Sequence, residues 1–399
     1  MNRLRYGYVA VLWICCALGS GCGGSGGSKS NLITTSGSNV APLSVNGGPT
    51  GNDVNEAFVS VTICVPNTST CQTIPNVLVD TGSPGLRIIS SQLTVSLPQQ
   101  MGSNSQPVAE CLPFLSGFTW GPVQTADIKI ASETASAVPV QVISTTAFPV
   151  PSACSNMGLQ PIETVAALGA NGLLGIGLAA QDCGSACTQS GAANPGLYYE
   201  CPAAGCQVTT EAVAQQVANP VGMFASDNNG VIIELPAVSG PETSLSGSLV
   251  FGIGTQSNNG LGSATVYTVD DFGNFTTTFK GVSYPGSFLD SGSNGLFFLD
   301  SNTSGIPDCP SGDGFYCPSS TQNLSATNQG VNNASGNVNF SIANADSLFS
   351  NGNDAVFGNI GGPGLNSFDW GLPFFYGRNV FTAIEGKSTP GGTGPFWAY

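Results

Sequence analysis

The chain has 399 residues, enough for about two domains, and 41% of them are apolar, which allows a substantial core. Its formal net charge is −15, from 8 basic and 23 acidic residues, so we expect no nucleic-acid partner, because its surface should repel phosphates. The absence of histidine excludes Ser-His-Asp and Cys-His nucleophilic sites and zinc sites built on histidine. Any chemistry must therefore come from carboxylates, hydroxyls, backbone amides or cysteines.

The N-terminus is typical of an export signal. Two arginines near the start precede an apolar stretch, residues 8–18, that is too short to remain as a permanent membrane anchor. The next residues, Leu-Gly-Ser-Gly-Cys at 18–22, resemble a bacterial lipoprotein cleavage box. We therefore expect residues 1–22 to be a lipoprotein signal peptide and Cys22 to be lipidated.

The cleavage box departs from the usual pattern at one position. Gly19 stands three residues before Cys22, where a large aliphatic residue is preferred. The alternative is an ordinary cleaved signal peptide that contains a cysteine. Lipidation predicts a cell-envelope protein, on the outer membrane because Gly23 rather than aspartate follows the cysteine, with the lipid as its sole membrane contact. The alternative predicts a periplasmic or secreted protein.

Residues 23–50 are rich in Gly, Ser and Asn and lack a hydrophobic period, so they are predicted to form a flexible tether. Regular structure should begin near Asn55. Helix is scarce, and the best candidate is residues 211–218, capped by Thr209 or Thr210. Turn residues separate short runs with the composition of strands, which predicts an all-β fold. These runs are residues 57–63, 77–79, 86–89, 126–131, 138–144, 230–235, 248–253, 264–269, 275–279, 297–299, 338–342 and 380–384.

Ten cysteines follow the export segment, and an even number in an exported chain predicts up to five disulfides. Short spacings favour Cys64–Cys71 and Cys309–Cys317, although sequence alone does not fix the pairing. The four cysteines at 183, 187, 201 and 206 are predicted to form two disulfides that close one loop. A metal site there is less favoured, because histidine is absent and the compartment is oxidising. We expect no metal and no organic cofactor. The remaining two cysteines are Cys111 and Cys154.

Two stretches of the chain resemble each other. Residues 76–86 and 286–296 both read apolar-apolar-Asp-(Thr/Ser)-Gly-Ser-x-Gly-Leu. An apolar run that ends in glycine follows each stretch at a similar distance, at residues 173–175 in the first half and 375–377 in the second. A single Asp-(Ser/Thr)-Gly is a weak signal, because aspartate is common in ordinary turns. Two complete copies favour a duplicated design.

The duplication predicts two β-rich lobes, residues 51–254 and 255–399. Each lobe supplies one aspartate, Asp80 or Asp290, and the two should face each other across a cleft. Like charges at close range do not both ionise, so one aspartate of such a pair stays protonated and the other acts as a base. This pair can activate a water against an amide carbonyl and protonate the leaving nitrogen.

The residues around each aspartate fit the same chemistry. Glycine lets the backbone approach the carboxylate and offer an amide donor. The hydroxyl residue after each aspartate can bridge the two loops, and the next serine can donate to an outer carboxylate oxygen. The supporting residues predicted in this way are Thr81, Gly82 and Ser83 in the first loop, and Ser291, Gly292 and Ser293 in the second.

At these residues the chain resembles the pepsin-like aspartic peptidases. Asp80-Thr81-Gly82-Ser83 and Asp290-Ser291-Gly292-Ser293 match their two active-site motifs, and the resemblance extends diffusely over residues 55–399. It implies a bilobed acid-protease architecture, endopeptidase activity at acid pH, and a peptide or protein substrate in the inter-lobe cleft. We expect a monomer. The context of the second motif is also similar to that of a bacterial family of exported proteins with no assigned function.

Three positions depart from the peptidase pattern. Arg87 replaces the tryptophan that follows the first motif, and Arg378 replaces the acidic residue that often follows the late glycine. No tyrosine occurs in residues 114–127, where the flap should lie, which leaves Phe118 and Trp120 as substitutes. The main alternative is a catalytically silent pepsin-like scaffold that binds a peptide or an envelope partner at the cell surface. A β-sandwich adhesin would fit the composition but not the paired motifs.

Overall fold

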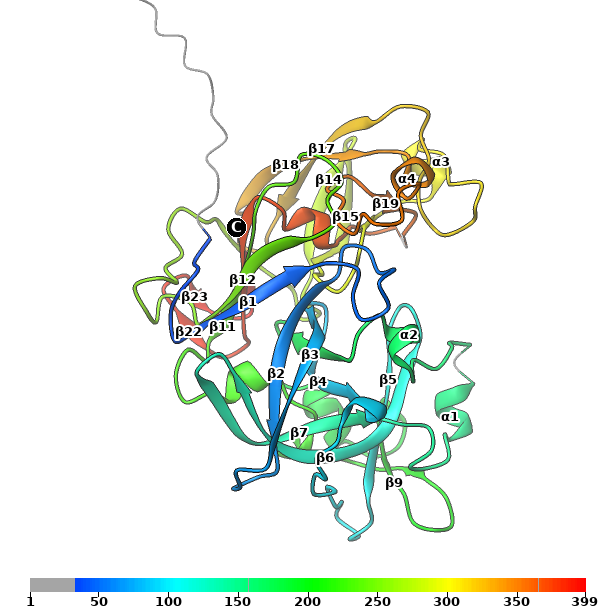
Figure 1. The fold of residues 1–399 in the computed structure, drawn as a ribbon, viewed down its shortest axis with the longest axis vertical. Coiled ribbons are helices and arrows are strands. Elements are labelled where there is room, and N and C mark those ends of the chain that lie inside the picture. The colour runs from blue at the N-terminus through cyan, green and yellow to red at the C-terminus, as the bar shows by residue number, and fades with distance from the viewer. Residues whose placement is uncertain (1–32, 157, 365) are drawn as a thin grey trace, which may run out of the picture. The chain divides into compact units, whose positions relative to one another are not determined.

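Short strands dominate the computed structural model, which describes residues 33–399 except 157 and 365 (Figure 1). The predicted signal peptide, Cys22 and the first part of the predicted tether lie outside the described residues. Within the strands, buried side chains alternate with partly exposed ones, as in β14 (Phe275–Phe279), where residues 275, 277 and 279 are buried. This alternation places one face of each strand on a core. The all-β prediction is confirmed.

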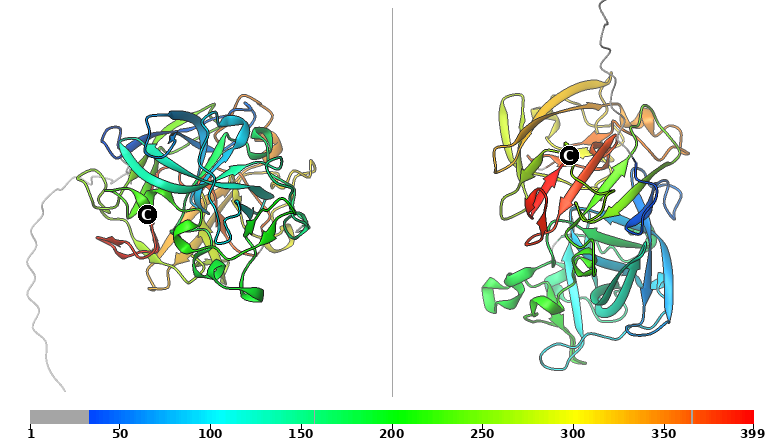
Figure 2. Two further views of the ribbon diagram at one scale, coloured as in Figure 1. Left: turned by 90° about the horizontal axis from the view of Figure 1, so that it is seen from below. Right: turned by 90° about the vertical axis from the view of Figure 1, so that its left-hand side faces the viewer.

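Fifteen strands form the larger sheet, in the order β10-β9-β5-β6-β7-β4-β8-β3-β2-β1-β12-β11-β21-β24-β13. Their bounds are β1 (Val40–Val45), β2 (Ala57–Cys64), β3 (Cys71–Asp80), β4 (Pro84–Ile89), β5 (Val108–Pro113), β6 (Phe118–Ile130), β7 (Glu133–Ile143), β8 (Gly172–Ile176), β9 (Tyr198–Glu200), β10 (Gln207–Val208), β11 (Gly230–Leu235), β12 (Leu245–Phe251), β13 (Val266–Thr268), β21 (Arg378–Ala383) and β24 (Phe396–Ala398). β21 and β24, drawn in orange to red, pair with β11 and β13 (Figure 2). The sheet therefore crosses the lobe boundary predicted at residue 254.

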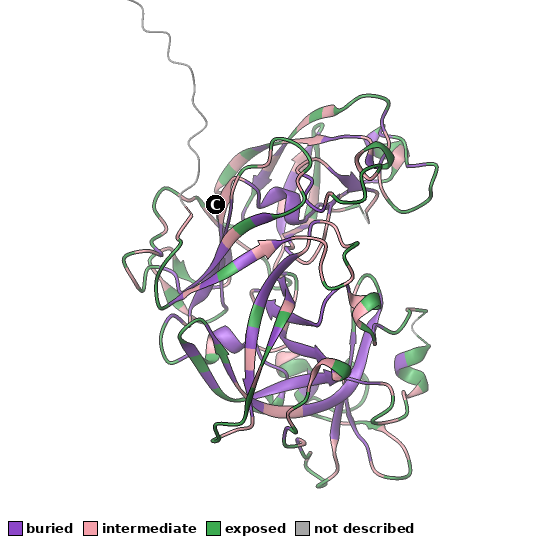
Figure 3. Cartoon of the chain, viewed as in Figure 1, coloured by how far each residue is buried: buried purple, intermediate pink, exposed green. Residues whose placement is uncertain are grey.

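Seven strands form a second sheet, in the order β18-β17-β14-β15-β20-β16-β19, entirely inside the predicted second lobe. Besides β14 they are β15 (Val282–Leu289), β16 (Leu296–Phe297), β17 (Gln322–Gln329), β18 (Ser335–Ile342), β19 (Gly361–Gly362) and β20 (Asp369–Trp370). A separate hairpin pairs β22 (Ser388–Thr389) with β23 (Gly392–Thr393). The largest apolar cluster takes residues from both large sheets, including Val79 and Leu289, which are fully buried. Figure 3 shows this burial along the strands and exposure in the loops.

Helices in the described residues are short. The α-helices are α1 (Ser152–Ser155), α2 (Val165–Leu168), α3 (Ser301–Ser304) and α4 (Ala345–Leu348). The 3₁₀ helices are η1 (Ser90–Gln92), η2 (Gly184–Thr188), η3 (Gly191–Ala193), η4 (Val213–Gln215), η5 (Pro220–Met223) and η6 (Leu372–Phe374). The helix predicted at 211–218 is wrong, because only the turn η4 forms there. Its N-cap residue is Ala212, which has no side-chain acceptor for the free amides.

The predicted tether is also partly wrong, because β1 lies inside it. β1 pairs with β12 along its whole length and with the start of β2. Ala41, Leu43 and Val45 are buried, a period of two that marks a strand with one face on the core. Ordered structure therefore begins before residue 51.

Five disulfides form among the described residues, which confirms the number expected. Cys64–Cys71 and Cys309–Cys317 pair as predicted, and the quartet forms Cys183–Cys187 and Cys201–Cys206. Cys111–Cys154 is the fifth. Disulfides persist in oxidising compartments, so the five bonds indicate an exported protein. No helix in the described part of the chain has the length and apolar character needed to cross a membrane.

Candidate active site

Both predicted aspartates lie where a buried strand ends. Asp80 is the last residue of β3, after three apolar residues that are at most 5% exposed. Asp290 directly follows β15, whose last residue, Leu289, is fully buried. Asp80 is 5% exposed and Asp290 is half-buried. Each carboxyl is therefore held at a fixed point by a strand that is anchored in the core.

A short strand runs parallel to each of these strands and supports the aspartate. In the first lobe this strand is β8, with Leu78 beside Leu173 and Asp80 beside Gly175. In the second lobe it is β20, with Phe288 beside Asp369. The two lobes therefore repeat the same local pattern around their aspartates.

The second-lobe counterpart of residues 173–175 is thus 369–371, and the prediction of 375–377 is wrong. A side chain at Gly175 would begin 2.7 Å from the Ser83 carbonyl oxygen, and one at Gly371 would begin 2.5 Å from that of Ser293. Glycine is therefore required at both points, because the site loop passes against it. Gly377 has no such contact with a site loop and instead precedes β21.

The two site loops interlock through their hydroxyl residues. The backbone amide of Thr81 donates to Ser291 Oγ at 3.1 Å, and the amide of Ser291 donates to Thr81 Oγ1 at 2.9 Å. Each hydroxyl then donates to a carbonyl of the other lobe's strand: Ser291 Oγ to Val79 at 2.7 Å, and Thr81 Oγ1 to Leu289 at 3.2 Å. Both hydroxyl residues are buried. This exchange fixes the distance between the strand ends that carry the two carboxyls.

The two carboxyls lie close together and have matching donors. The Gly82 amide donates to Asp80 Oδ1 at 2.7 Å, and the Gly292 amide donates to Asp290 Oδ1 at 2.8 Å. A single point, where a side chain on Gly292 would begin, is 2.9 Å from Asp80 Oδ1 and 3.2 Å from Asp290 Oδ1. Any larger residue there would displace the carboxyls.

Each loop also supplies one serine donor to the outer carboxyl oxygens. Ser83 Oγ donates to Asp80 Oδ2, and Ser293 Oγ lies 3.0 Å from Asp290 Oδ2. The structure thus brings together all eight residues that were predicted for this site. Burial, and then the negative charge of Asp290, raise the pKa of Asp80 well above its usual range. Two acids in this arrangement hold one proton between them.

A third carboxyl, which the sequence did not suggest, belongs to the same cluster. Asp369 is the first residue of β20, is 6% exposed, and lies with Oδ2 2.6 Å from Ser293 Oγ. Burial, and then the charges of Asp290 and Asp80, raise its pKa well above the usual range. The signal that could have found it is the Phe-Asp-Trp-Gly run at 368–371, in which an acid interrupts an otherwise apolar strand.

The predicted flap substitutes are not available to a substrate. Phe118 and Trp120 are 3% and 1% exposed, and they pack in an apolar cluster with Tyr199 around Cys111–Cys154. The turn between β5 and β6 instead exposes Leu115, which is 73% exposed, whereas Phe114 is half-buried against an apolar cluster that includes Leu78.

Arg87, which replaces the expected tryptophan, braces the first site loop. Its Nη1 donates to the Pro84 carbonyl at 2.7 Å. Its Nη2 forms ion pairs with Glu110 at 2.8 Å and Asp182 at 2.9 Å, and the three side chains are at most 1% exposed. Tyr198 donates its hydroxyl to Asp182 at 2.7 Å. The network therefore connects the loop after Asp80 to strand β5 and to the segment 183–206, the disulfide loop, which holds Cys183–Cys187 and Cys201–Cys206.

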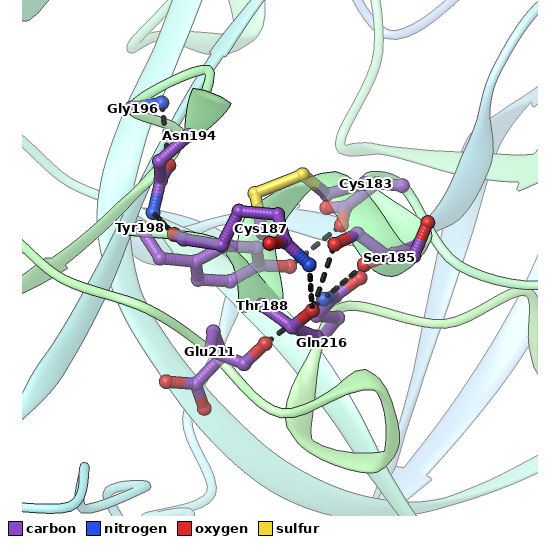
Figure 4. The surroundings of a disulfide bond; sticks show 12 residues. Cys183, Ser185, Cys187, Thr188, Asn194, Gly196, Tyr198, Glu211 and Gln216 are labelled. Atoms are coloured by element: carbon purple, nitrogen blue, oxygen red, sulfur yellow. Dashed lines mark hydrogen bonds between the residues drawn. A yellow bond between two sulfur atoms is a disulfide. The ribbon is translucent and has the colours of Figure 1, made fainter. Parts of the chain in front are cut away.

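The disulfide loop lies beside this network. Figure 4 shows Cys183–Cys187 next to Tyr198 and Gln216. The Gln216 side-chain amide donates to the Gly184 carbonyl at 2.8 Å and to the Glu211 carbonyl at 3.0 Å. The Val217 amide donates to the Tyr198 hydroxyl at 2.7 Å. These contacts join the loop to a buried tyrosine.

Arg378, which replaces an acidic residue of the peptidase pattern, contacts Phe374. Its Nη1 donates to the Phe374 carbonyl, and its guanidinium lies 4.4 Å from the centre of the Phe374 ring. Both residues line a cavity of about 640 Å³ together with Trp370 and strands β17 and β18. Neither Asp80 nor Asp290 lines that cavity. The candidate active site is therefore the carboxyl cluster and not this cavity.

The described structure is similar to an aspartic proteinase from Irpex lacteus, with a TM-score of 0.51 and 14% sequence identity, over 90% of this chain and 96% of that one. At this identity the likeness shows the fold alone, which is bilobed and pepsin-like. A sequence search of curated proteins finds no match. The family model described as "Protein of unknown function (DUF3443)" matches residues 35–399. The chain therefore belongs to the DUF3443 family and has a pepsin-like fold.

Proposed function

We propose that this protein is an aspartic endopeptidase that hydrolyses peptide bonds through a water held between Asp80 and Asp290. The observation that carries the proposal is the pair of interlocked loops, which present two carboxyl oxygens around a single point. A scaffold that only binds a ligand does not need this paired geometry. The proposal requires neither a metal nor an organic cofactor.

The chemistry follows from the protonation of the pair. Asp80 holds the proton, in line with its raised pKa, and this leaves Asp290 to act as the base. Asp290 takes a proton from the bound water while the water oxygen attacks the amide carbon, and Asp80 donates its own proton to the carbonyl oxygen. The tetrahedral intermediate then collapses, the C–N bond breaks, and the leaving nitrogen receives a proton from Asp290. One hydroxyl of the intermediate loses its proton to Asp80 as the new carboxyl group forms.

Donors around the pair support each of these steps. The amides of Gly82 and Gly292 and the hydroxyls of Ser83 and Ser293 stabilise negative charge on the two carboxyls. Because active enzyme needs one ionised and one protonated aspartate, kcat/KM should follow a bell-shaped pH profile on the acid side of neutrality.

The experiment is cleavage of a denatured protein or peptide library between about pH 3 and 7, near the ordinary carboxyl pKa. Asp80→Asn and Asp290→Asn should each reduce kcat/KM by about 10²–10⁴-fold, the contribution typical of a general acid or base. Asp271→Asn, at an exposed position, is the matched control. A statine-type transition-state mimic should inhibit the wild type.

Two results would contradict the peptidase. Equal activity in wild type and both site variants would assign the cleavage to a contaminant. A folded wild type that is inert at every pH would leave the alternative, a silent scaffold that binds a peptide or an envelope partner.

A further inference from the structure

The hydroxyl of Ser293 lies between two carboxyls. Its Oγ is 3.0 Å from Asp290 Oδ2 and 2.6 Å from Asp369 Oδ2, and both distances are within hydrogen-bonding range. A serine hydroxyl has one hydrogen and can donate only one hydrogen bond. If both carboxyls were ionised, one of the two contacts would join oxygen lone pairs with no proton between them. One of the two carboxyls must therefore carry a proton and donate to Ser293.

The surroundings favour Asp369 as the protonated one. Asp290 accepts an additional hydrogen bond from the Gly292 amide at 2.8 Å, which stabilises its charge. Asp369 is 6% exposed, and its Oδ1 is buried without a hydrogen-bond partner. A buried carboxylate with one oxygen unpaired is costly, whereas an unpaired oxygen on a neutral acid costs much less.

The charged groups near Asp369 also favour its protonated form. Its neighbours on the adjacent strands β15 and β16 are Phe288 and Phe297, which carry no charge. The charges that act on it come from Asp290 and Asp80, and both are acidic. Burial and these charges raise the pKa of Asp369, which agrees with the hydrogen-bond argument.

We propose that Asp369 is a positioning residue that stays protonated and donates to Ser293 Oγ, which directs the Ser293 hydrogen onto Asp290 and keeps Asp290 the ionised member of the pair. The proposal rests on the proposed function for its effect on catalysis, but its protonation state does not depend on turnover. The working site then holds three carboxyls, two protons and one negative charge.

The first lobe has no equivalent of this relay. The residue that corresponds to Asp369 there is Leu173, and Ser83 contacts only Asp80 among the carboxyls of the described residues. The third acid therefore makes two otherwise similar half-sites different. With Asp369 donating to it, the Ser293 hydroxyl is polarised and stabilises negative charge on Asp290 more than Ser83 does on Asp80, which favours Asp290 as the base and Asp80 as the acid.

The first test counts protons directly. The intact mature protein, labelled with carboxyl-¹³C aspartate, is followed by NMR from about pH 3 to 8, around the ordinary aspartate pKa of about 3.9. Two site carboxyls should remain protonated above about pH 5, and Asp369→Asn should remove one of the two signals. Asp271→Asn should leave both in place. A single protonated carboxyl in the wild type, or two in Asp369→Asn, would overturn the proposal.

The second test uses the pH dependence of kcat/KM. Asp369→Asn keeps a neutral donor next to Ser293, so the acid limb should keep its position. Asp369→Leu copies the first lobe and has no donor, so Ser293 still donates to Asp290 but is no longer polarised by a proton from residue 369. The acid limb should therefore move to higher pH, because the hydrogen bond from Ser293 stabilises the Asp290 anion less. If Asp369 were ionised, Asp369→Asn would remove a nearby negative charge and shift both limbs to lower pH by about one unit or more. That result would refute the relay. If every variant is inert, the peptidase proposal fails and the NMR experiment alone decides the protonation of Asp369.

Discussion

Thr81 and Ser291 exchange hydrogen bonds across the two site loops, the amide of each donating to the hydroxyl oxygen of the other at 3.1 and 2.9 Å. Ser291→Ala should destabilise the protein by about 1–3 kcal/mol, because the buried Thr81 amide loses its acceptor and the Val79 carbonyl loses its donor. Urea unfolding measures the loss. Ser291→Thr, which copies the first loop, is the control and should recover most of it. Equal stability of the alanine and threonine variants would contradict the interlock.

Arg87 compensates two buried carboxylates. Arg87→Met should destabilise the fold by about 3–5 kcal/mol, because Glu110 and Asp182 would be left buried without a cation. Combining it with Glu110→Gln and Asp182→Asn should recover a large part of that stability, since the uncompensated charges disappear. Denaturant unfolding of the single and triple variants tests this. A triple variant less stable than Arg87→Met would show that the network is not held by charge compensation.

Glu56 should make the folded state less stable as pH rises. Burial, and then the charge of Asp53, raise its pKa from 4.5 to about 8. Between these values the folded chain binds a proton that the unfolded chain has released, so stability falls with pH by up to about 1.4 kcal/mol per unit. Glu56→Gln should therefore flatten the decline of Tm between about pH 5 and 8. An unchanged slope in this variant would contradict the assignment.

The five disulfides should differ in their contribution to stability. Cys111–Cys154 spans 43 residues, whereas Cys183–Cys187 spans four. The double variant Cys111→Ser/Cys154→Ser should lose about 3–4 kcal/mol, because the longer loop gains more entropy when it is opened in the unfolded chain. Cys183→Ser/Cys187→Ser is the control and should lose less. Equal losses, measured by thermal or urea unfolding, would contradict this order.

Cys22, which lies outside the described residues, should carry the lipid of an outer-membrane lipoprotein. Growth with a clickable fatty acid should label the wild type, and Cys22→Ala should abolish the label and release the protein from the membrane fraction. Cys15→Ala, inside the predicted signal peptide, is the control and should remain labelled. Freely released, unlabelled wild type would instead support the ordinary signal peptide.

The sequence by itself determined the features that depend on local patterns. Short strands between turn residues predicted the all-β fold, and the duplicated Asp-(Thr/Ser)-Gly-Ser motif predicted the eight residues that meet at the site. Two short disulfides were predicted from spacing, because close cysteines can pair with little chain rearrangement. The alternation of Ala41, Leu43 and Val45 was present in the sequence but was hidden by the polar composition around it.

Only the tertiary structure decided the features that depend on contacts between distant residues. Register along β15 assigned residues 369–371 to the support of Asp290, because glycine is needed where the site loop passes and not merely after an apolar run. The same register brought Asp369 to Ser293, 76 residues away in the chain. Arg87 likewise found its two partners 23 and 95 residues away, across strand pairings that no local pattern encodes. Short-range propensities act along the chain, whereas the protonation and bracing of this site are set by neighbours that only folding brings together.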